Sequence, residues 1–209
     1  MSETSQRNET GRIEAFSDGV FAIAITLLVL TIRVPNATEL AGGVSLGSAL
    51  LSLWPHYLAF VTSFATILAE WVNHHRIFTF VRKCDHTFLY WNGLVLLLVT
   101  FLPFPTALVA EYLRHPEAKV AGAVYSGTYF AIALAFKGLW HYASVNGRLL
   151  GQGRRADAAD IEQITKQLRF GPVMYFAAFA ASFLSGALSV GSCLCLAVFF
   201  GFKGWPTRE

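Results

Sequence analysis

Long apolar runs separated by short polar segments repeat along the whole chain. A helix that crosses a bilayer needs roughly 20 mostly apolar residues. Each of the first four runs reaches that length and predicts one transmembrane helix. These helices are expected at about 16–34, 46–72, 88–112 and 120–145. Pro55 is expected to kink the second helix, and Pro103 with Pro105 the third, because proline removes a backbone hydrogen bond.

The last apolar stretch, from Phe170 to Phe202, is too long for one untilted span and short for two. Gly186, Ser189 and Gly191 lie near its middle and favour a tight turn there. Two short helices, at about 168–186 and 188–203, are therefore predicted; a single long helix is the alternative. The full expectation is six helices in one transmembrane domain that covers residues 1–209.

The composition of the whole chain indicates a membrane protein. Of the 209 residues, 55% are hydrophobic and 14% are charged, against roughly 25% charged residues in a soluble domain. Mean hydropathy is +0.50. These values exclude an ordinary soluble enzyme, a disordered chain and a nucleic-acid binder, and they predict an all-α membrane protein in a lipid bilayer. The net charge of +3 is too small to indicate an anionic partner.

The positions of the basic residues predict the orientation. Cytoplasmic segments of membrane proteins retain Lys and Arg. With the N-terminus inside, twelve basic residues fall on the cytoplasmic side and three outside. The outer three are Arg33, Arg114 and Lys119. The chain is therefore expected in the cell (inner) membrane as a multi-pass protein with both termini in the cytoplasm.

Polar groups inside a bilayer are costly, so each is a candidate for function. Asp18 and Ser17 lie near the cytoplasmic end of the first predicted helix, where they either cap that helix or face a polar cluster. The inner end of the second helix supplies such a cluster. Four of its residues share one face through i, i+3, i+4 and i+7 spacing: Trp71, His74, His75 and Phe78. We expect the indole and imidazole groups to satisfy Asp18 and Ser17 across a helix–helix interface.

The sequence gives little support for a metal or cofactor. Two adjacent histidines do not share a helix face well enough to chelate one ion, and Glu70 precedes them at the wrong interval for a metalloprotease motif. The three cysteines, Cys84, Cys193 and Cys195, predict no disulfide framework. No metal, no cofactor and no enzymatic activity are expected. A membrane-embedded enzyme with a histidine-based metal site is kept as an alternative that metal analysis would test.

One stripe of the first helix carries a second hypothesis. Ile23, Thr26, Leu27 and Leu30 follow i, i+3, i+4, i+7 spacing. A lone helix with this stripe is a simple anchor. Several copies around one axis would instead form apolar rings with a hydroxyl ring between them, a constriction that gates a pore by dewetting.

A proton-coupled secondary transporter is the other alternative. Lys137 and His141 lie one turn apart in the fourth predicted helix, and a transporter would use such a pair together with Asp18. Lys137 is expected either to pair with Glu70 or Glu111, or to extend its ammonium group to the membrane interface.

The segment from Arg12 through Phe16-Ser17-Asp18-Gly19 to Thr26 resembles the first-helix signature of the transmembrane protein 175 potassium-channel family. Trp71-Val-Asn-His74-His75-Arg76 resembles the second recurring block of that family. The resemblance implies a homotetrameric channel that passes potassium ions, with a pore lined by the first helix of each subunit and no carbonyl-lined filter.

The same resemblance implies roles for individual residues. It makes Ile23, Leu27 and Leu30 the apolar constriction and Thr26 the polar layer of the pore. Ala22 occupies the position where some relatives have serine, which implies weaker discrimination of potassium from sodium. The network that holds the first helix would comprise Arg12, Phe16, Ser17, Asp18, Trp71 and one of His74 and His75.

Overall fold

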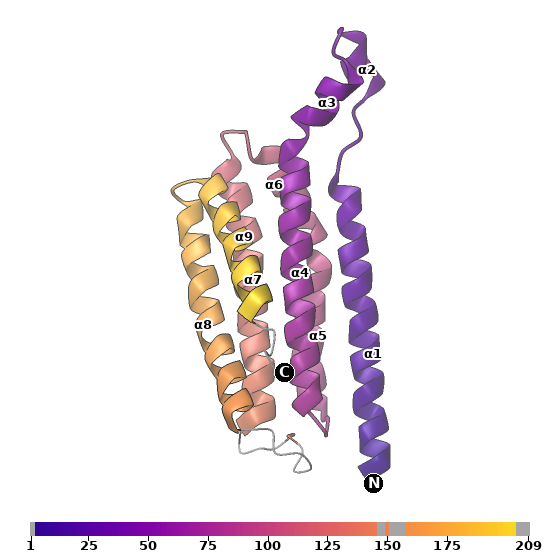
Figure 1. The fold of residues 1–209 in the computed structure, drawn as a ribbon, viewed down its shortest axis with the longest axis vertical. Coiled ribbons are helices and arrows are strands. Elements are labelled where there is room, and N and C mark those ends of the chain that lie inside the picture. The colour runs from indigo at the N-terminus through magenta and orange to yellow at the C-terminus, as the bar shows by residue number, and fades with distance from the viewer. Residues whose placement is uncertain (1–2, 146–148, 151–157, 204–209) are drawn as a thin grey trace.

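A computed structural model describes residues 3–145, 149–150 and 158–203. The described part is helical throughout, with one isolated β-bridge between Val81 and Leu150. The predicted all-α class is confirmed (Figure 1). The elements are α1 (Glu3–Leu27), the 3-10 helix η1 (Leu28–Thr31), α2 (Ala37–Ala41), α3 (Leu46–Ser52), α4 (Trp54–Phe80), α5 (His86–Phe101), α6 (Pro103–Tyr112), α7 (Ala118–Ser144), α8 (Ala158–Ser182) and α9 (Gly186–Lys203).

The helix breaks coincide with the prolines. Pro55 lies in the first turn of α4, and α3 meets α4 at an angle of 47°. Pro103 begins α6, and only Leu102 separates it from α5, which ends at Phe101. Proline is tolerated in the first turn of a helix because that turn has no amide partner within the helix. Both predicted kinks are therefore breaks between consecutive helices.

Several predicted helix ends are wrong. The first helix was expected at 16–34, but α1 starts at Glu3 and ends at Leu27, followed by η1 and by extended backbone at Ile32. The second was expected to end at 72, but α4 continues to Phe80. The fifth was expected at 168–186, but α8 runs from Ala158 to Ser182. Hydropathy detects the apolar part of a helix, whereas helical hydrogen bonding continues into polar segments outside the bilayer.

Six long apolar spans are not all present in the described residues. Three helical segments are long and apolar enough to cross a membrane: Glu9–Thr31, His86–Tyr112 and Ala118–Ser144. The bent pair of α3 and α4 is a fourth if it counts as one span, and Gly186–Phe200 is a shorter apolar helix. The turn between α8 and α9 separates them at 183–185, so the alternative of one long helix is wrong.

The helices form a bundle in which α1 lies at one edge (Figure 1). On one side, α7, α8 and α9 pack against each other and against α4. On the other side, α1 contacts only α4, α5 and η1 extensively among the described elements. One long side of α1 is therefore left uncovered by its own chain.

Close packing and hidden polar contacts hold the centre of the bundle together. The Ser63 hydroxyl on α4 lies 2.8 Å from the Thr106 hydroxyl on α6 and 3.0 Å from the Tyr125 hydroxyl on α7. All three residues are fully buried. Polar groups in such a place need internal partners, because hydrocarbon offers none. This cluster links α4, α6 and α7, and α4 also carries part of the candidate site.

Candidate functional site: the exposed face of α1 and its anchor

Helix α1 and the 3-10 helix η1 that continues it have two different faces. The face toward the bundle carries Ser17, Phe21, Ala24 and Leu28, each at most 1% exposed. The opposite face carries the stripe singled out from the sequence: Ile23 is 58% exposed, Leu27 42% and Leu30 76%. In a membrane protein such a face meets either lipid or another chain, and residues on other helices, such as Leu97 at 64% and Val173 at 65%, are similarly exposed.

Thr26 is the polar position of this stripe. Its side chain is exposed, and its hydroxyl donates to the Ile23 carbonyl at 2.9 Å. The Thr26 hydroxyl proton is therefore engaged in a hydrogen bond within α1, while the hydroxyl oxygen can still accept a hydrogen bond on the exposed side. An oxygen ring between apolar rings is the arrangement that this geometry would produce if copies of α1 faced each other.

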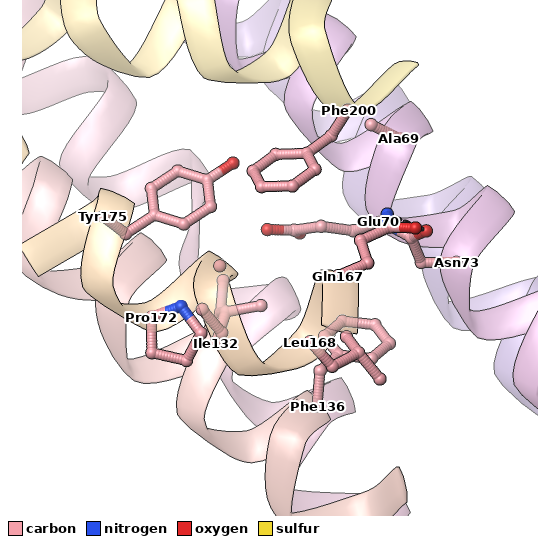
Figure 2. Close-up of a pocket in the computed structure, with 12 residues that line it drawn as sticks. Ala69, Glu70, Asn73, Ile132, Phe136, Gln167, Leu168, Pro172, Tyr175 and Phe200 are labelled. Atoms are coloured by element: carbon pink, nitrogen blue, oxygen red, sulfur yellow. Dashed lines mark hydrogen bonds between the residues drawn. The ribbon is translucent and has the colours of Figure 1, made fainter. Parts of the chain in front are cut away.

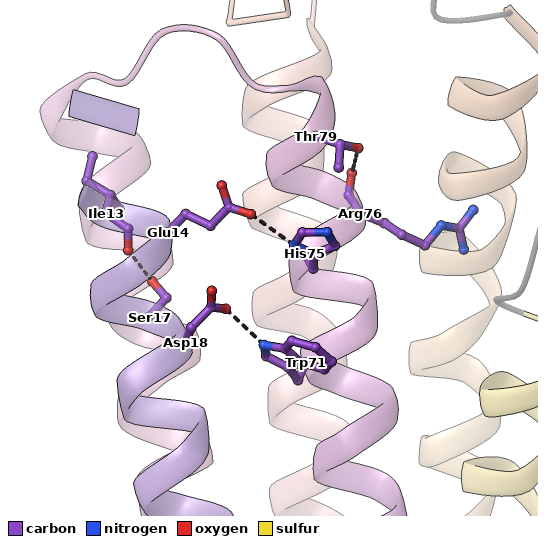
Figure 3. Close-up of polar contacts among 8 residues, drawn as sticks. All are labelled: Ile13, Glu14, Ser17, Asp18, Trp71, His75, Arg76 and Thr79. Atoms are coloured by element: carbon purple, nitrogen blue, oxygen red, sulfur yellow. Dashed lines mark hydrogen bonds and ion pairs between the residues drawn. The ribbon is translucent and has the colours of Figure 1, made fainter. Parts of the chain in front are cut away.

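Two polar contacts fasten the N-terminal part of α1 to α4 (Figure 3). The Trp71 indole N–H donates to Asp18 Oδ1 at 2.8 Å. One turn away, His75 Nδ1 lies 3.0 Å from Glu14 Oε1. The Trp71 and His75 rings are stacked, with centroids 6.1 Å apart. Because the helices are antiparallel, two carboxylates spaced i, i+4 on α1 meet two ring donors spaced i, i+4 on α4.

A second, deeper set of contacts links α1 to α5. His74 Nε2 lies 2.8 Å from Asn92 Oδ1, and Asn92 Nδ2 donates to the Ser17 hydroxyl at 3.0 Å. Ser17 in turn donates to the Ile13 carbonyl at 2.9 Å. His74, Asn92 and Ser17 are all buried. The two histidines therefore have different partners: His75 meets Glu14, His74 reaches Ser17 through Asn92, and neither bonds Asp18 directly.

Other predicted members of the network lie outside these contacts. Arg12 is exposed, and Phe16 is 67% exposed on the uncovered side of α1. Sequence reasoning overlooked Asn92 and Glu14. Asn92 is a polar residue inside a predicted apolar span, which was a sufficient signal. Glu14 had no such signal, because it lies in a polar segment before the first expected helix.

The histidines do not form part of a metal centre in the described structure. Within the described ranges, no group of three or more His, Cys, Asp or Glu side chains is placed to hold an ion. Lys137 and His141 are both exposed. Glu70, by contrast, is buried, and Glu111 lies 3.7 Å from His56. Of the three alternatives for Lys137, the exposed position agrees with an ammonium group that extends to the membrane interface.

Replacing Asp18 by alanine is expected to weaken the anchor. The change leaves the Trp71 indole N–H without its acceptor at a partly buried interface, at a cost of about 1–3 kcal/mol. Asp18→Asn is the matched control, because its side-chain carbonyl still accepts the indole proton. Thermal unfolding and detergent gel filtration are the measurements. An Asp18→Ala protein as stable as Asp18→Asn, with an unchanged elution volume, would contradict the anchoring role.

Replacing Asn92 by leucine is expected to destabilise the chain more than Asp18→Ala does. Leucine is similar in size but leaves buried His74 and Ser17 without their shared partner, which costs roughly 2–5 kcal/mol. Thermal unfolding measures the loss, and Asn92→His, which keeps a donor and an acceptor, tests whether hydrogen bonding matters. Equal melting temperatures of Asn92→Leu and the parent would refute this account.

The fold and the contacts define a class of protein: an all-helical membrane-channel fold. The family model described as "Endosomal/lysosomal potassium channel TMEM175" matches residues 12–103, which include both anchor segments and the stripe. The chain belongs to the TMEM175 family.

Relatives match nearly the full length. A potassium channel of Chamaesiphon minutus is 60% identical, over 97% of this chain and 98% of its own length. A potassium channel of Streptomyces collinus is 44% identical, over 97% of each chain. The crystal structure of a lysosomal potassium-selective channel TMEM175 homolog from Chamaesiphon minutus superposes with a TM-score of 0.86 at 58% identity, covering 94% of this chain and 98% of that chain.

Proposed function

We propose that this protein is a potassium-permeable channel in which four identical chains surround one pore lined by α1. The observation that carries the proposal is the uncovered side of α1, where Ile23, Leu27 and Leu30 are exposed in the single chain. Full-length relatives named as potassium channels support the choice of ion.

Within this proposal, the stripe is the narrowest part of the pore. Rings of Ile23, Leu27 and Leu30 exclude water until the helices move apart, and a cation passes only after it sheds water. Thr26 supplies the polar layer through its outward oxygen. Ala22 offers no hydroxyl next to the constriction, so discrimination of potassium from sodium is expected to be modest.

The proposed role of the anchor is to hold α1 at a fixed rotation. Turning α1 about its axis would break the Asp18–Trp71 and Glu14–His75 contacts together, since both lie on one side of the helix. Arg12 and Phe16, on the exposed side, are proposed to meet the neighbouring subunit.

The proposed topology has six spans per subunit, in the cell membrane, with both termini in the cytoplasm. The fifth and sixth spans are the apolar part of α8 and the short helix α9. The first turns of α8, which carry Asp160, Glu162 and Lys166, would lie in cytoplasm, and their Glu162–Lys166 pair at 2.7 Å is exposed. Hydrogen bonding to Lys166 lowers the pKa of Glu162, which favours the charged form of this carboxyl group.

A flux assay on purified protein tests this function. Liposomes with the protein are expected to pass potassium down its gradient at a rate that scales with potential and does not saturate at low concentration. Native mass of the same sample in a membrane mimetic is expected to correspond to four chains. Slow, saturable, proton-coupled uptake would replace the channel by the transporter, and a mass of one chain would refute the shared pore.

A further inference from the structure

A second feature of the chain lies on the opposite side of α4 from the anchor. Glu70 is only 7% exposed, and its Oε2 atom has no hydrogen-bond partner among the described residues. The carboxyl group borders a cavity of about 50 Å³ between α4, α7, α8 and the end of α9. In Figure 2 the carboxyl end of Glu70 points away from α4 into the space bordered by Tyr175 and Phe200.

Among the described residues, the side chains that line the Glu70 cavity supply no positive charge. No Lys, Arg or His is among the residues that line the cavity. Glu70 acts electrostatically on Tyr125 and Tyr129 of α7, Tyr175 of α8 and Cys193 of α9, all of them weak acids. A buried carboxylate is stable only when it is paired, and a buried carboxyl without a cation is neutral. No described side chain pairs with Glu70 Oε2, so a cation bound in the cavity would stabilise the charged form of this group.

The cavity walls favour a particular kind of cation. Three aromatic rings contribute to the lining: Phe136, Tyr175 and Phe200. The Tyr175 and Phe200 rings are stacked, with centroids 6.3 Å apart. Aromatic faces attract ammonium groups, most strongly where water is excluded. A potassium ion instead needs a full shell of oxygen atoms in place of its water, and a single carboxyl with apolar walls does not provide one.

An amide contact between α4 and α8 borders the cavity on one side. Gln167 on α8 donates to Asn73 Oδ1 at 2.9 Å and accepts from Arg76 at 3.1 Å. Gln167 and Asn73 also line the cavity (Figure 2).

We propose that the Glu70 cavity is a binding site for a small primary ammonium ion, one in each subunit and separate from the pore. The ammonium N–H groups donate to the carboxylate, and the short alkyl group lies against Phe136 and Phe200. A cavity of about 50 Å³ accepts an ion of two or three non-hydrogen atoms. The site depends on the packing of α4, α7, α8 and α9 and not on the pore assignment.

Thermal unfolding of the full chain in lipid nanodiscs tests the site. Melting temperatures are compared in methylammonium, potassium and tetramethylammonium chloride at equal ionic strength. Methylammonium is expected to raise the melting temperature by about 3 °C over the other two salts. Tetramethylammonium is the reference, because it is too large for the cavity and has no N–H donor.

Two variants locate the effect. Glu70→Gln is expected to abolish the methylammonium shift, whereas Glu111→Gln, which removes an exposed carboxyl at the other end of the bundle, is expected to keep it. If Glu70→Gln does not fold, Phe200→Leu decides, since it removes one aromatic wall and should at least halve the shift. A shift that persists in Glu70→Gln would place methylammonium elsewhere, as in the pore, and would overturn the proposal. So would no shift in the parent, or an equal shift with potassium.

Discussion

Replacing Ile23 by asparagine is expected to raise potassium conductance at least about tenfold and to bring the potassium-to-sodium permeability ratio close to one. A tenfold rise corresponds to about 1.4 kcal/mol taken off the barrier. In the proposed pore, the apolar ring of Ile23 resists ions because it cannot replace the water they lose. Asparagine puts an amide at that position, so the constriction stays wet and ions pass with part of their hydration shell.

The measurement is flux and reversal potential for purified protein in liposomes. Ile23→Val is the matched control, because it keeps an apolar ring and removes only one methylene; it should retain the selectivity of the parent. Protein unfolding does not complicate this variant, since Ile23 is 58% exposed and contributes little to the core of the single chain. Identical flux and permeability ratios for Ile23→Asn and the parent would show that Ile23 does not line the pore.

Replacing Gly186 by alanine is expected to lower the melting temperature by about 5–10 °C. A β-carbon at Gly186 would lie 2.1 Å from the Ala118 carbonyl oxygen and 2.6 Å from the carbonyl carbon. These are backbone atoms of α7, so no side chain can rotate away. The two helices would have to move apart, and overpacking of this kind costs about 1–3 kcal/mol or more.

Gly191→Ala is the control for that experiment. It lies in the same helix, α9, and a β-carbon there meets nothing within 4 Å. The general effect of placing alanine in a helix is therefore present without the clash, and the melting temperature should stay the same or rise. If both variants unfold at the same temperature as the parent, then α7 and α9 are not held at the close distance that the structure gives.

The hydropathy pattern was sufficient for the class of fold and for the order of the helices. The apolar run around 120–145 and its neighbour at 88–112 correspond to α7 and to α5 with α6. Helix ends were less well predicted. The apolar segment that favours membrane insertion stops at one residue, whereas the helical hydrogen bonding continues beyond it. The start of α1 at Glu3 is the largest example.

Part of the candidate site could be predicted from the sequence and part could not. The spacing of Ile23, Thr26, Leu27 and Leu30 identified one face of a helix from the sequence, and the structure leaves that face uncovered. Which histidine meets which partner could not be read from spacing. His74 and His75 are adjacent and so point in directions about 100° apart, and only the placement of α5 brings Asn92 to one of them.

The sequence by itself determined that the chain is an all-helical membrane protein whose first helix carries an apolar stripe along one face. A helix in lipid needs a long apolar run, and its side chains repeat with the helical period, so both features can be read from the sequence. Only the tertiary structure decided that Glu14 and Asp18 meet His75 and Trp71, and that Glu70 faces a cavity. Those pairings depend on the rotation and offset of antiparallel helices, and contacts between residues more than fifty positions apart leave no periodic trace in a single sequence.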